Sequence, residues 1–383
     1  MSDRIFETDR MTRRERVEAT LNHQPVDRAA IHEQVSYNPG VMAMYTGKTI
    51  EGFDYGLDEI CTVIGRTLDM CFPPFPPCGT GRVTSDDGFV FQHDNWTAWR
   101  VSRPFTDAQG ARDWLLARTA ALRETPRTSG FALPGQEGQH SGGGQDLRAD
   151  YRRDMLETQS KIGGAVLCNF SGTGFCGVFD AMGLELFTYF SMDYPDVLAD
   201  YMRLSTQHEL ARVHVAADVE LSPVILIPED FSTKQGPIFP PEFLHSHHYP
   251  YVKALTEAWH EHGVKVIYHS DGNYKKAIPA LIDCGVDGFY CLEPACGMDI
   301  VQLKRTYPDM VWAGGIDGVD LMERGEPEDV RAEVHRHIRE SNVLAEGGMF
   351  IATSAEINPP VKPENFRAMV EAVGELTNPD FAV

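Results

Sequence analysis

The chain has 383 residues, of which 42% are hydrophobic, and its formal net charge is −22 at pH 7. A chain of this length can bury a large core, either as one α/β domain or as two smaller ones. The strong negative charge argues against nucleic acids and anionic membranes as partners, because their phosphates would be repelled.

The sequence shows no sign of membrane insertion or secretion. It contains no apolar run of about 18 residues, so no transmembrane helix is expected. The first residues, MSDRIFETDRMTRRERVEAT, are charged and lack the apolar core of a signal peptide, which favours a cytoplasmic protein. The eight cysteines lack zinc-finger spacing, so we expect free thiols rather than disulfides.

The first expected elements are a helix and a short strand. Residues 11–25 predict a helix in which Thr12 is the N-cap and Glu15 completes a capping box. Residues 27–34, DRAAIHEQ, predict a strand that ends in His32 and Glu33.

Two insertions are expected before the regular part of the chain. Alternating apolar residues around Asp-Asp-Gly predict an antiparallel hairpin over residues 81–102. Residues 124–150 are rich in Gly, Ser, Gln and Pro and predict a long, flexible, lid-like loop. Strand–helix pairs continue on both sides of this loop, so we expect residues 1–383 to form a single domain.

From residue 165 onward, short apolar strands alternate with helical patterns of ten or more residues. The expected strands are 165–172, 223–230, 264–272, 287–294, 311–317 and 349–356. Strands that are apolar on both faces and alternate with helices form parallel sheets. With residues 27–34 they make seven strands, one short of a closed barrel, and the eighth is expected within residues 50–80. No glycine-rich phosphate loop follows the first strand, so the sequence predicts a (β/α)8 TIM-type barrel rather than a doubly wound nucleotide-binding fold.

Polar side chains gather at the carboxyl ends of these strands, where barrel enzymes carry their chemistry. They are His32, Glu33, Cys168, Asn169, Glu229, Asp230, His269, Asp271, Glu293, Asp317 and Glu356. Singly, such an acid is often a helix N-cap, and such a histidine is often a hydrogen-bonded core residue. Together, close carboxylates repel at roughly 1–4 kcal/mol per pair, so the cluster must be hydrated, protonated or bridged by a cation. Imidazole among oxygen ligands suits zinc or another divalent ion.

Several segments resemble motifs of one known family. They are MTRRERVEATLNHQPVDR near the start, EDFSTKQGPIFPPEF at 229–243, HSDGN at 269–273, LIDCGVDGFYCLEP at 281–294, MDIVQLKRTYP followed by GGID at 314–317, and VKPENFRAMVEAV near the end. The family is the uroporphyrinogen decarboxylase superfamily, which includes the decarboxylase itself and zinc-dependent, corrinoid-linked methyltransferases. The resemblance spans nearly the whole chain and implies an eight-stranded barrel with its site at the strand ends.

The resemblance favours the methyltransferase branch. The decarboxylase grips a porphyrinogen with eight carboxylates through arginines after the first strand, whereas residues 32–40, HEQVSYNPG, contain no arginine. The methyltransferases bind zinc through a His-x-Cys pair and a later cysteine. The matching positions here are His269, Asp271 and a residue near Glu356, so both cysteines are replaced and the site is richer in oxygen.

The leading hypothesis is a methyltransferase that moves a methyl group from a small, ether-type donor to a corrinoid on a separate carrier protein. A Lewis-acid metal or a buried carboxylic acid would stabilise the departing oxygen. The expected ligands of zinc, or of another divalent metal, are His269, Asp271, Glu293 and Glu356. The expected catalytic residues are Asp230, His269, Asp271 and Glu293. The expected substrate-binding residues are His32, Glu33, Asn169, Glu229, Gln235 and Asp317.

Two alternatives stay open at this point. One is a metal-free lyase or decarboxylase that acts on a small acid, with acid–base chemistry from His269 and Asp271. The other is a non-enzymatic protein whose acidic mouth binds a cation. The resemblance further implies a homodimer.

Overall fold

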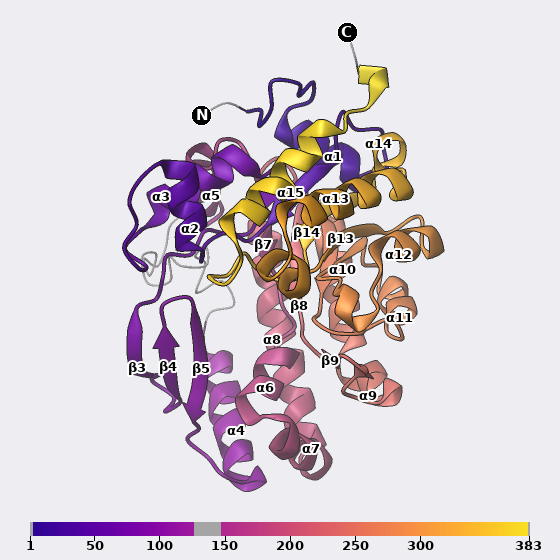
Figure 1. The fold of residues 1–383 in the computed structure, drawn as a ribbon. Helices are drawn as coiled ribbons and strands as arrows, with labels where there is room; N and C mark the ends of the chain where they lie inside the picture. The colour runs from indigo at the N-terminus through magenta and orange to yellow at the C-terminus, as the bar shows by residue number, and fades with distance from the viewer. Residues whose placement is uncertain (1–2, 126–146, 382–383) are drawn as a thin grey trace.

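The computed structural model describes residues 3–125 and 147–381, and a ring of parallel strands lies at its centre (Figure 1). The strand order is β6-β2-β1-β14-β13-β12-β11-β8-β7, and every pairing in it is parallel. The bounds are β1 Ala30–Glu33, β2 Met70–Cys71, β6 Val166–Leu167, β7 Asn169–Phe170, β8 Val224–Pro228, β11 Lys265–His269, β12 Gly288–Tyr290, β13 Val311–Ile316 and β14 Met349–Thr353.

The nine strands fill eight positions, because β6 and β7 are separated only by Cys168 and form one passage of the chain. β6 pairs with β2 and β7 pairs with β8, so this passage joins the two edges of the sheet. The strand expected within residues 50–80 is β2. The predicted barrel is therefore confirmed.

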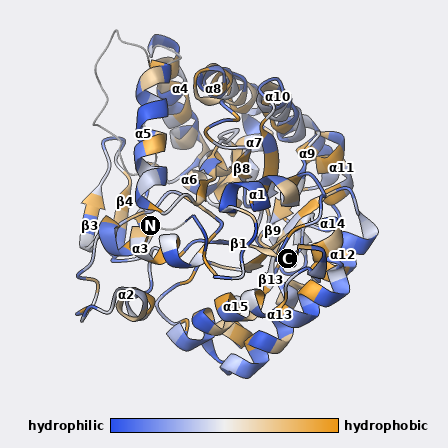
Figure 2. Cartoon of the chain, turned by 90° about the horizontal axis from the view of Figure 1, so that it is seen from above, coloured by the Kyte–Doolittle hydropathy of each residue, from blue (hydrophilic) through white to orange (hydrophobic). Residues whose placement is uncertain are grey.

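Helices surround this ring, and their outer faces are largely hydrophilic when seen from above (Figure 2). Their bounds are α1 Arg13–Leu21, α2 Pro39–Thr46, α3 Leu57–Thr67, α4 Ala108–Glu124, α5 Leu147–Lys161, α6 Phe175–Met182, α7 Leu184–Asp193, α8 Pro195–Ala216, α9 Pro241–His247, α10 Tyr249–His260, α11 Ile278–Asp283, α12 Ile300–Thr306, α13 Pro327–Ser341, α14 Val343–Glu346 and α15 Pro363–Glu375. The capping box that the sequence predicts at Thr12 and Glu15 is present at the start of α1. Among the helices of the described residues, none combines the length and apolar character that a membrane span needs.

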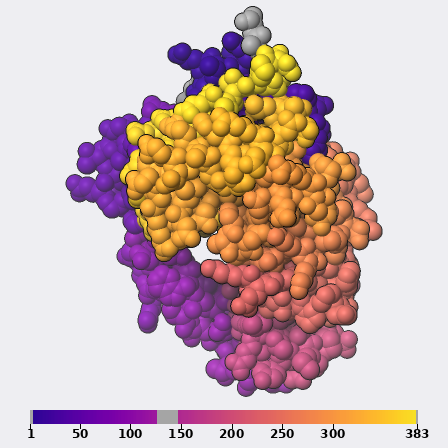
Figure 3. All heavy atoms as spheres, turned by 45° about the vertical axis from the view of Figure 1, so that its right-hand side comes forward, coloured from indigo at the N-terminus to yellow at the C-terminus, as the bar shows by residue number. Residues whose placement is uncertain are grey.

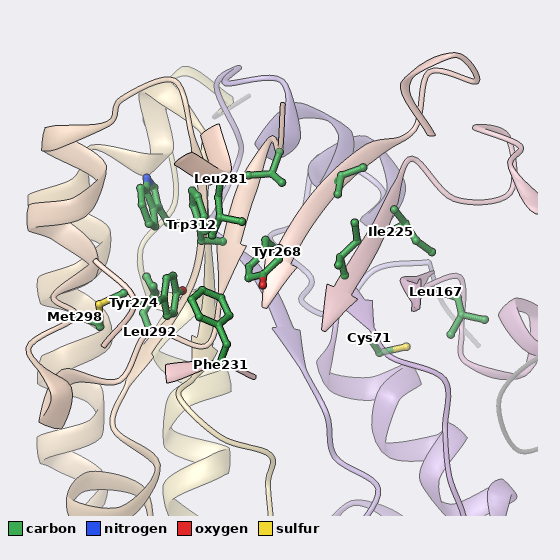
Figure 4. Close-up of a cluster of buried hydrophobic side chains, with 14 of the residues drawn as sticks. Cys71, Leu167, Ile225, Phe231, Tyr268, Tyr274, Leu281, Leu292, Met298 and Trp312 are labelled. Carbon is green, nitrogen blue, oxygen red and sulfur yellow. The ribbon is translucent and has the colours of Figure 1, made fainter. Parts of the chain in front are cut away.

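Alternate residues of each strand feed two separate cores, as the period of two requires. The inner core fills the barrel and includes Ala30, Leu226, Ile267 and Phe350. The outer core lies between the strands and the helices, where side chains such as Trp312 pack (Figure 4). A strand residue's parity therefore decides whether its side chain points into the barrel or away from it.

The amino end of the barrel is closed by a buried network of ion pairs. Arg16 contacts Asp27 and Asp69, each at 2.7 Å, and Arg28 contacts Asp9 and Asp69 at the same distance. All five side chains are nearly inaccessible to solvent. Both chain termini lie at this end of the molecule (Figure 1).

A second, antiparallel sheet extends beyond the barrel. It consists of β3 Thr80–Thr84, β4 Val90–Asp94 and β5 Thr97–Ser102, so the segment expected to form a two-stranded hairpin has three strands. The surface is hollowed between this sheet and the C-terminal part of the chain (Figure 3). Most of the loop expected at 124–150 lies outside the described residues.

Candidate functional site

Three potential metal ligands converge at the carboxyl ends of β11 and β12. His269 ends β11, Asp271 follows it by two residues, and Cys291 follows β12 directly. Asp271 Oδ1 lies 3.8 Å from His269 Nε2 and accepts a hydrogen bond from Cys291 Sγ at 2.9 Å. One ligand atom from each residue lies within 4.8 Å of the other two.

Asp230, which follows β8, supports this cluster from the side. Its Oδ1 accepts the backbone N–H of Asp271 at 2.9 Å and lies 3.4 Å from His269 Nδ1. The imidazole contact is long and poorly aligned, so Nδ1 is buried without an aligned hydrogen-bond partner in the described part of the chain. Asp230 thus holds the backbone of Asp271 and faces the imidazole of His269.

Cys291 reaches the cluster through an unusual backbone conformation. In β12, Phe289 points into the outer core and Tyr290 into the barrel, so strict alternation would send Cys291 outward. Cys291 instead has φ of +66° and lies inside the barrel beside Tyr290. Its Sγ is also 3.0 Å from the carbonyl oxygen of Ser354. Cys291 was not among the residues expected at the strand ends, because the strand expected at 287–294 placed it in mid-strand, whereas β12 ends at Tyr290.

The cluster opens into a cavity of about 240 Å³ at the mouth of the barrel. Its apolar floor is formed by Phe72, Phe170, Leu226, Pro228 and Tyr290. Residues that follow the strand ends bring carboxylates to its rim, namely Asp230, Asp271 and Glu356. Among the described residues, no lysine or arginine lines this cavity.

The carboxylates set the charge states of their neighbours. Burial would lower the pKa of His269, but the carboxylates of Asp230 and Asp271 outweigh it and raise that pKa above its ordinary value. Burial raises the pKa of Asp271. Burial and the charge of Asp271 raise the pKa of the Cys291 thiol well above its usual range. Without a metal, Cys291 is therefore a protonated donor to Asp271.

The donor set fits a zinc ion. An imidazole nitrogen, a carboxylate oxygen and a thiol sulfur are all zinc ligands, and three protein ligands leave the fourth position open, as in catalytic zinc sites. A bound cation would also reverse the protonation of Cys291, because a coordinating thiol loses its proton. The side chains of His269, Asp271 and Cys291 thus provide a site of the correct chemistry.

Comparison with known proteins decides the family. A family model described as uroporphyrinogen decarboxylase (URO-D) matches residues 157–376, which is more than half of the chain. The chain belongs to the uroporphyrinogen decarboxylase family. No curated protein matches it.

One solved structure shows the same fold for this member of the uroporphyrinogen decarboxylase family. A methyltransferase from Methanosarcina mazei aligns with a TM-score of 0.63 and 16% identity, over 95% of this chain and 99% of that one. A probable 3-DHS dehydratase from Bacillus anthracis aligns with a TM-score of only 0.28 and 12% identity, over 59% of this chain and 82% of that one, too weakly to support an argument.

The structure brings two of the four expected metal ligands together. His269 and Asp271 share the cluster with Cys291, and Glu356 lines the same cavity. Glu293 is held elsewhere: its Oε1 accepts the N–H of Gly272 at 2.5 Å and its Oε2 accepts the thiol of Cys296 at 3.3 Å. The side chain of Glu293 therefore stabilises the loop after β11 and does not line the cavity.

Two of the expected substrate-binding residues, Glu33 and Asn169, have side chains that point away from the barrel interior. Glu33 Oε2 accepts hydrogen bonds from the backbone N–H of Thr353 at 2.8 Å and from the hydroxyl of Thr353 at 2.7 Å. Burial raises the pKa of Glu33 to about 7. Asn169 Nδ2 donates to the hydroxyl of Tyr151 at 2.9 Å, against α5. Neither side chain lines the cavity.

Glu229 also points outward, although the adjacent Asp230 faces the cavity. Its carboxylate accepts the N–H groups of Thr173 and Cys176, each at 2.8 Å. It thereby satisfies the free backbone donors at the start of α6. Its function is to anchor the turn that precedes α6.

The other expected substrate-binding residues occupy three different places. His32 points into the barrel beneath the cavity, its ring 4.6 Å from that of Phe72 and 5.1 Å from that of Tyr290, and burial lowers its pKa to about 4. Asp317 caps the turn of π-helix that follows β13. Gln235 lies in the exposed turn between β9 Ser232–Thr233 and β10 Gly236–Pro237.

Proposed function

We propose that this protein is a zinc-dependent methyltransferase that moves a methyl group from a small, ether-type donor to a corrinoid on a separate carrier protein. The observation that carries the proposal is the cluster of His269, Asp271 and Cys291 at one side of a small cavity. The Methanosarcina mazei methyltransferase shares the fold over nearly its whole length, which is consistent with this activity.

His269, Asp271 and Cys291 would hold the metal, and the ion would supply Lewis acidity toward the donor oxygen. The carboxylate of Asp230 faces His269 Nδ1, so it can accept a hydrogen bond from a proton on that nitrogen. This contact would fix the tautomer in which Nε2 is unprotonated and faces Asp271. The apolar floor closes the barrel beneath the site and restricts access by water. In the proposed transfer, the donor's C–O bond would break and the oxygen would keep the bonding electron pair. The corrinoid on the carrier protein would accept the methyl group, with its cobalt(I) supplying both electrons of the new bond and becoming cobalt(III).

The cavity lining disfavours a porphyrinogen as the substrate. The decarboxylase that gives the family its name works on a substrate with eight carboxylates, which needs cationic partners. In the described part of the chain the lining of this cavity contains three acids and neither lysine nor arginine. Repulsion between like charges in a half-buried cavity would oppose binding.

A metal-free lyase is the second candidate, favoured by the contact between Asp230 and His269. The raised pKa of His269 would let the imidazolium act as a general acid. The same lack of cationic side chains in the cavity makes a small acid a poor substrate, so the methyltransferase ranks first.

Elemental analysis of freshly purified protein separates the two candidates. The methyltransferase should contain about one zinc ion per chain, and adding cob(I)alamin with candidate methyl ethers should produce the absorbance of methylcobalamin. His269→Ala should lose both properties, whereas His214→Ala, an exposed histidine on α8, should keep both. Metal-free wild-type protein that decarboxylates small acids would replace the first proposal with the second. The expected homodimer and cytoplasmic location stay predictions.

A further inference from the structure

Three aromatic rings lie close together at the cavity floor. The ring of Phe72 lies 5.1 Å from that of Phe170 and 5.4 Å from that of Tyr290, measured between centroids, and all three rings line the cavity. Phe170 belongs to β7, Tyr290 belongs to β12, and Phe72 directly follows β2, so rings from three different strands of the barrel meet in its interior. Aromatic faces carry a negative electrostatic potential that attracts cations.

The rim above this floor is rich in carboxylates, and two of them, those of Asp230 and Glu356, lie outside the candidate metal cluster. With zinc present, the two positive charges balance Asp271 and the Cys291 thiolate, and the carboxylates of Asp230 and Glu356 remain. No lysine or arginine among the described residues lines the cavity to offset them.

We infer that the cavity binds a small methylated ammonium cation, with the cationic group between the aromatic floor and the carboxylates of Asp230 and Glu356. This inference rests on the proposed function in one respect, because it takes this cavity as the substrate site. It adds that the methyl donor carries an ammonium group. Desolvated cations gain most from aromatic faces, and a nearby carboxylate adds a direct charge interaction.

Three probes of the same shape and different charge test this inference. Choline is a cation, dimethylbutanol is its neutral carbon isostere, and dimethylbutyrate is the anion of similar shape. Isothermal titration calorimetry on the purified full chain should show choline binding at least about tenfold more tightly than the neutral alcohol. The anion should give no measurable binding.

Two substitutions assign the selectivity to the two surfaces. Phe170→Leu keeps an apolar side chain but removes the aromatic face, and Glu356→Gln removes one charge with little change of shape. Each should weaken choline binding by about tenfold and leave dimethylbutanol binding within about twofold of the wild type. Glu51→Gln, at an exposed loop position between α2 and α3, is the matched control and should leave choline binding unchanged.

Equal affinity for choline and dimethylbutanol, or unchanged choline affinity in both cavity variants, would overturn the inference. Binding is measured without turnover, so its outcome is independent of the proposed reaction. Methylcobalamin formation from neutral ethers, with no binding of choline, would sustain the proposed reaction and refute the inference. Selective choline binding by a protein that forms no methylcobalamin would support the inference and refute the proposed reaction.

Discussion

At Cys291 the backbone takes a left-handed conformation that costs a non-glycine residue about 1 kcal/mol or more. The turn brings the sulfur to 2.9 Å from Asp271 Oδ1 and 3.0 Å from the carbonyl oxygen of Ser354. Strained residues of this kind concentrate at functional sites, where the surrounding structure holds them in place. The left-handed backbone at Cys291 therefore distinguishes the cluster of His269, Asp271 and Cys291 from a group of acids that merely follow strand ends.

Replacing Cys291 by serine tests its contribution to metal binding. Serine keeps the size and the hydrogen bond but replaces a thiolate by a neutral hydroxyl, which is a much weaker zinc ligand. We expect Cys291→Ser to lower bound zinc to well below half of the wild-type content, measured by elemental analysis after dialysis. Cys296→Ser is the control, because that thiol contacts Glu293 outside the cluster and should leave the zinc content unchanged. Equal zinc in the two variants would exclude Cys291 as a ligand.

The sequence was sufficient to find the polar residues at the carboxyl ends of the strands, but not the direction in which each side chain points. Parity along β8 sends Glu229 outward and Asp230 inward, and parity along β1 separates Glu33 from His32 in the same way. Sequence patterns locate a strand only to within a residue or two. Because successive side chains of a strand point to opposite faces, an error of one residue assigns a side chain to the wrong face of the barrel wall. The positive φ of Cys291 turns its side chain away from the direction that strand alternation predicts, and no local sequence pattern indicates this conformation.

At the scale of elements, β12 is positioned by an unusually close contact with β13. Gly288 pairs with Val311, and a Cβ atom added at Gly288 would lie 2.4 Å from the Val311 carbonyl oxygen. Only glycine allows the two strands to approach this closely without a backbone shift. Since β12 leads directly into Cys291, the same contact sets the position of the candidate ligand.

Gly288→Ala should therefore destabilise the fold and weaken the metal cluster together. We expect a loss of about 1–3 kcal/mol in the free energy of unfolding, measured in urea. The matched control is Gly177→Ala in α6, where an added Cβ meets nothing within 4 Å and helix propensity favours alanine by up to about 1 kcal/mol. If Gly288→Ala were as stable as Gly177→Ala, the close contact would not constrain β12.

Two features of the sheets were not located from the sequence, and the reasons differ: β2 is too short to show periodicity, and the turn between β4 and β5 carries no strong turn motif. β2 has only the residues Met70 and Cys71, and it is recognisable mainly by its pairing with β1 and β6. In the second sheet, β4 and β5 are joined by a two-residue turn at Asn95, whose φ is +52°, and the sequence analysis merged them into one arm of a hairpin. The strands of the C-terminal half were predictable because they are mostly apolar and helical patterns separate them.

At the scale of the whole molecule, the two ends of the barrel differ in how their charged side chains are paired. The amino end is sealed by arginines paired with buried aspartates. The carboxyl end is open, and among the described residues that line its cavity there is no lysine or arginine to pair with the carboxylates. Breaking a buried pair leaves an uncompensated charge and costs far more than breaking an exposed one. The sealed end can therefore stabilise the barrel while the open end keeps an excess of negative charge for binding.

Asp69 is fully buried at the sealed end, where it contacts both Arg16 and Arg28 at 2.7 Å. Burial would raise the pKa of Asp69, but the charges of the two arginines and hydrogen bonds from Arg28 and Ile31 outweigh it and hold that pKa at about 2. A carboxyl group whose pKa falls on folding stabilises the protein above its unfolded pKa. This stabilisation disappears as the pH falls through the folded value.

Asp69→Asn should lower the free energy of unfolding at pH 7 by about 3–5 kcal/mol, because it leaves buried arginine charge uncompensated. The difference from the wild type should shrink by about 2 kcal/mol between pH 4 and pH 2, where the wild type alone loses the contribution of the ionised Asp69. Urea unfolding at a series of pH values measures both effects. Asp320→Asn, which removes an exposed contact with Arg324, should change stability by less than about 1 kcal/mol at any pH. A difference between Asp69→Asn and the wild type that stayed constant down to pH 2 would show that the arginines do not hold the pKa of Asp69 low.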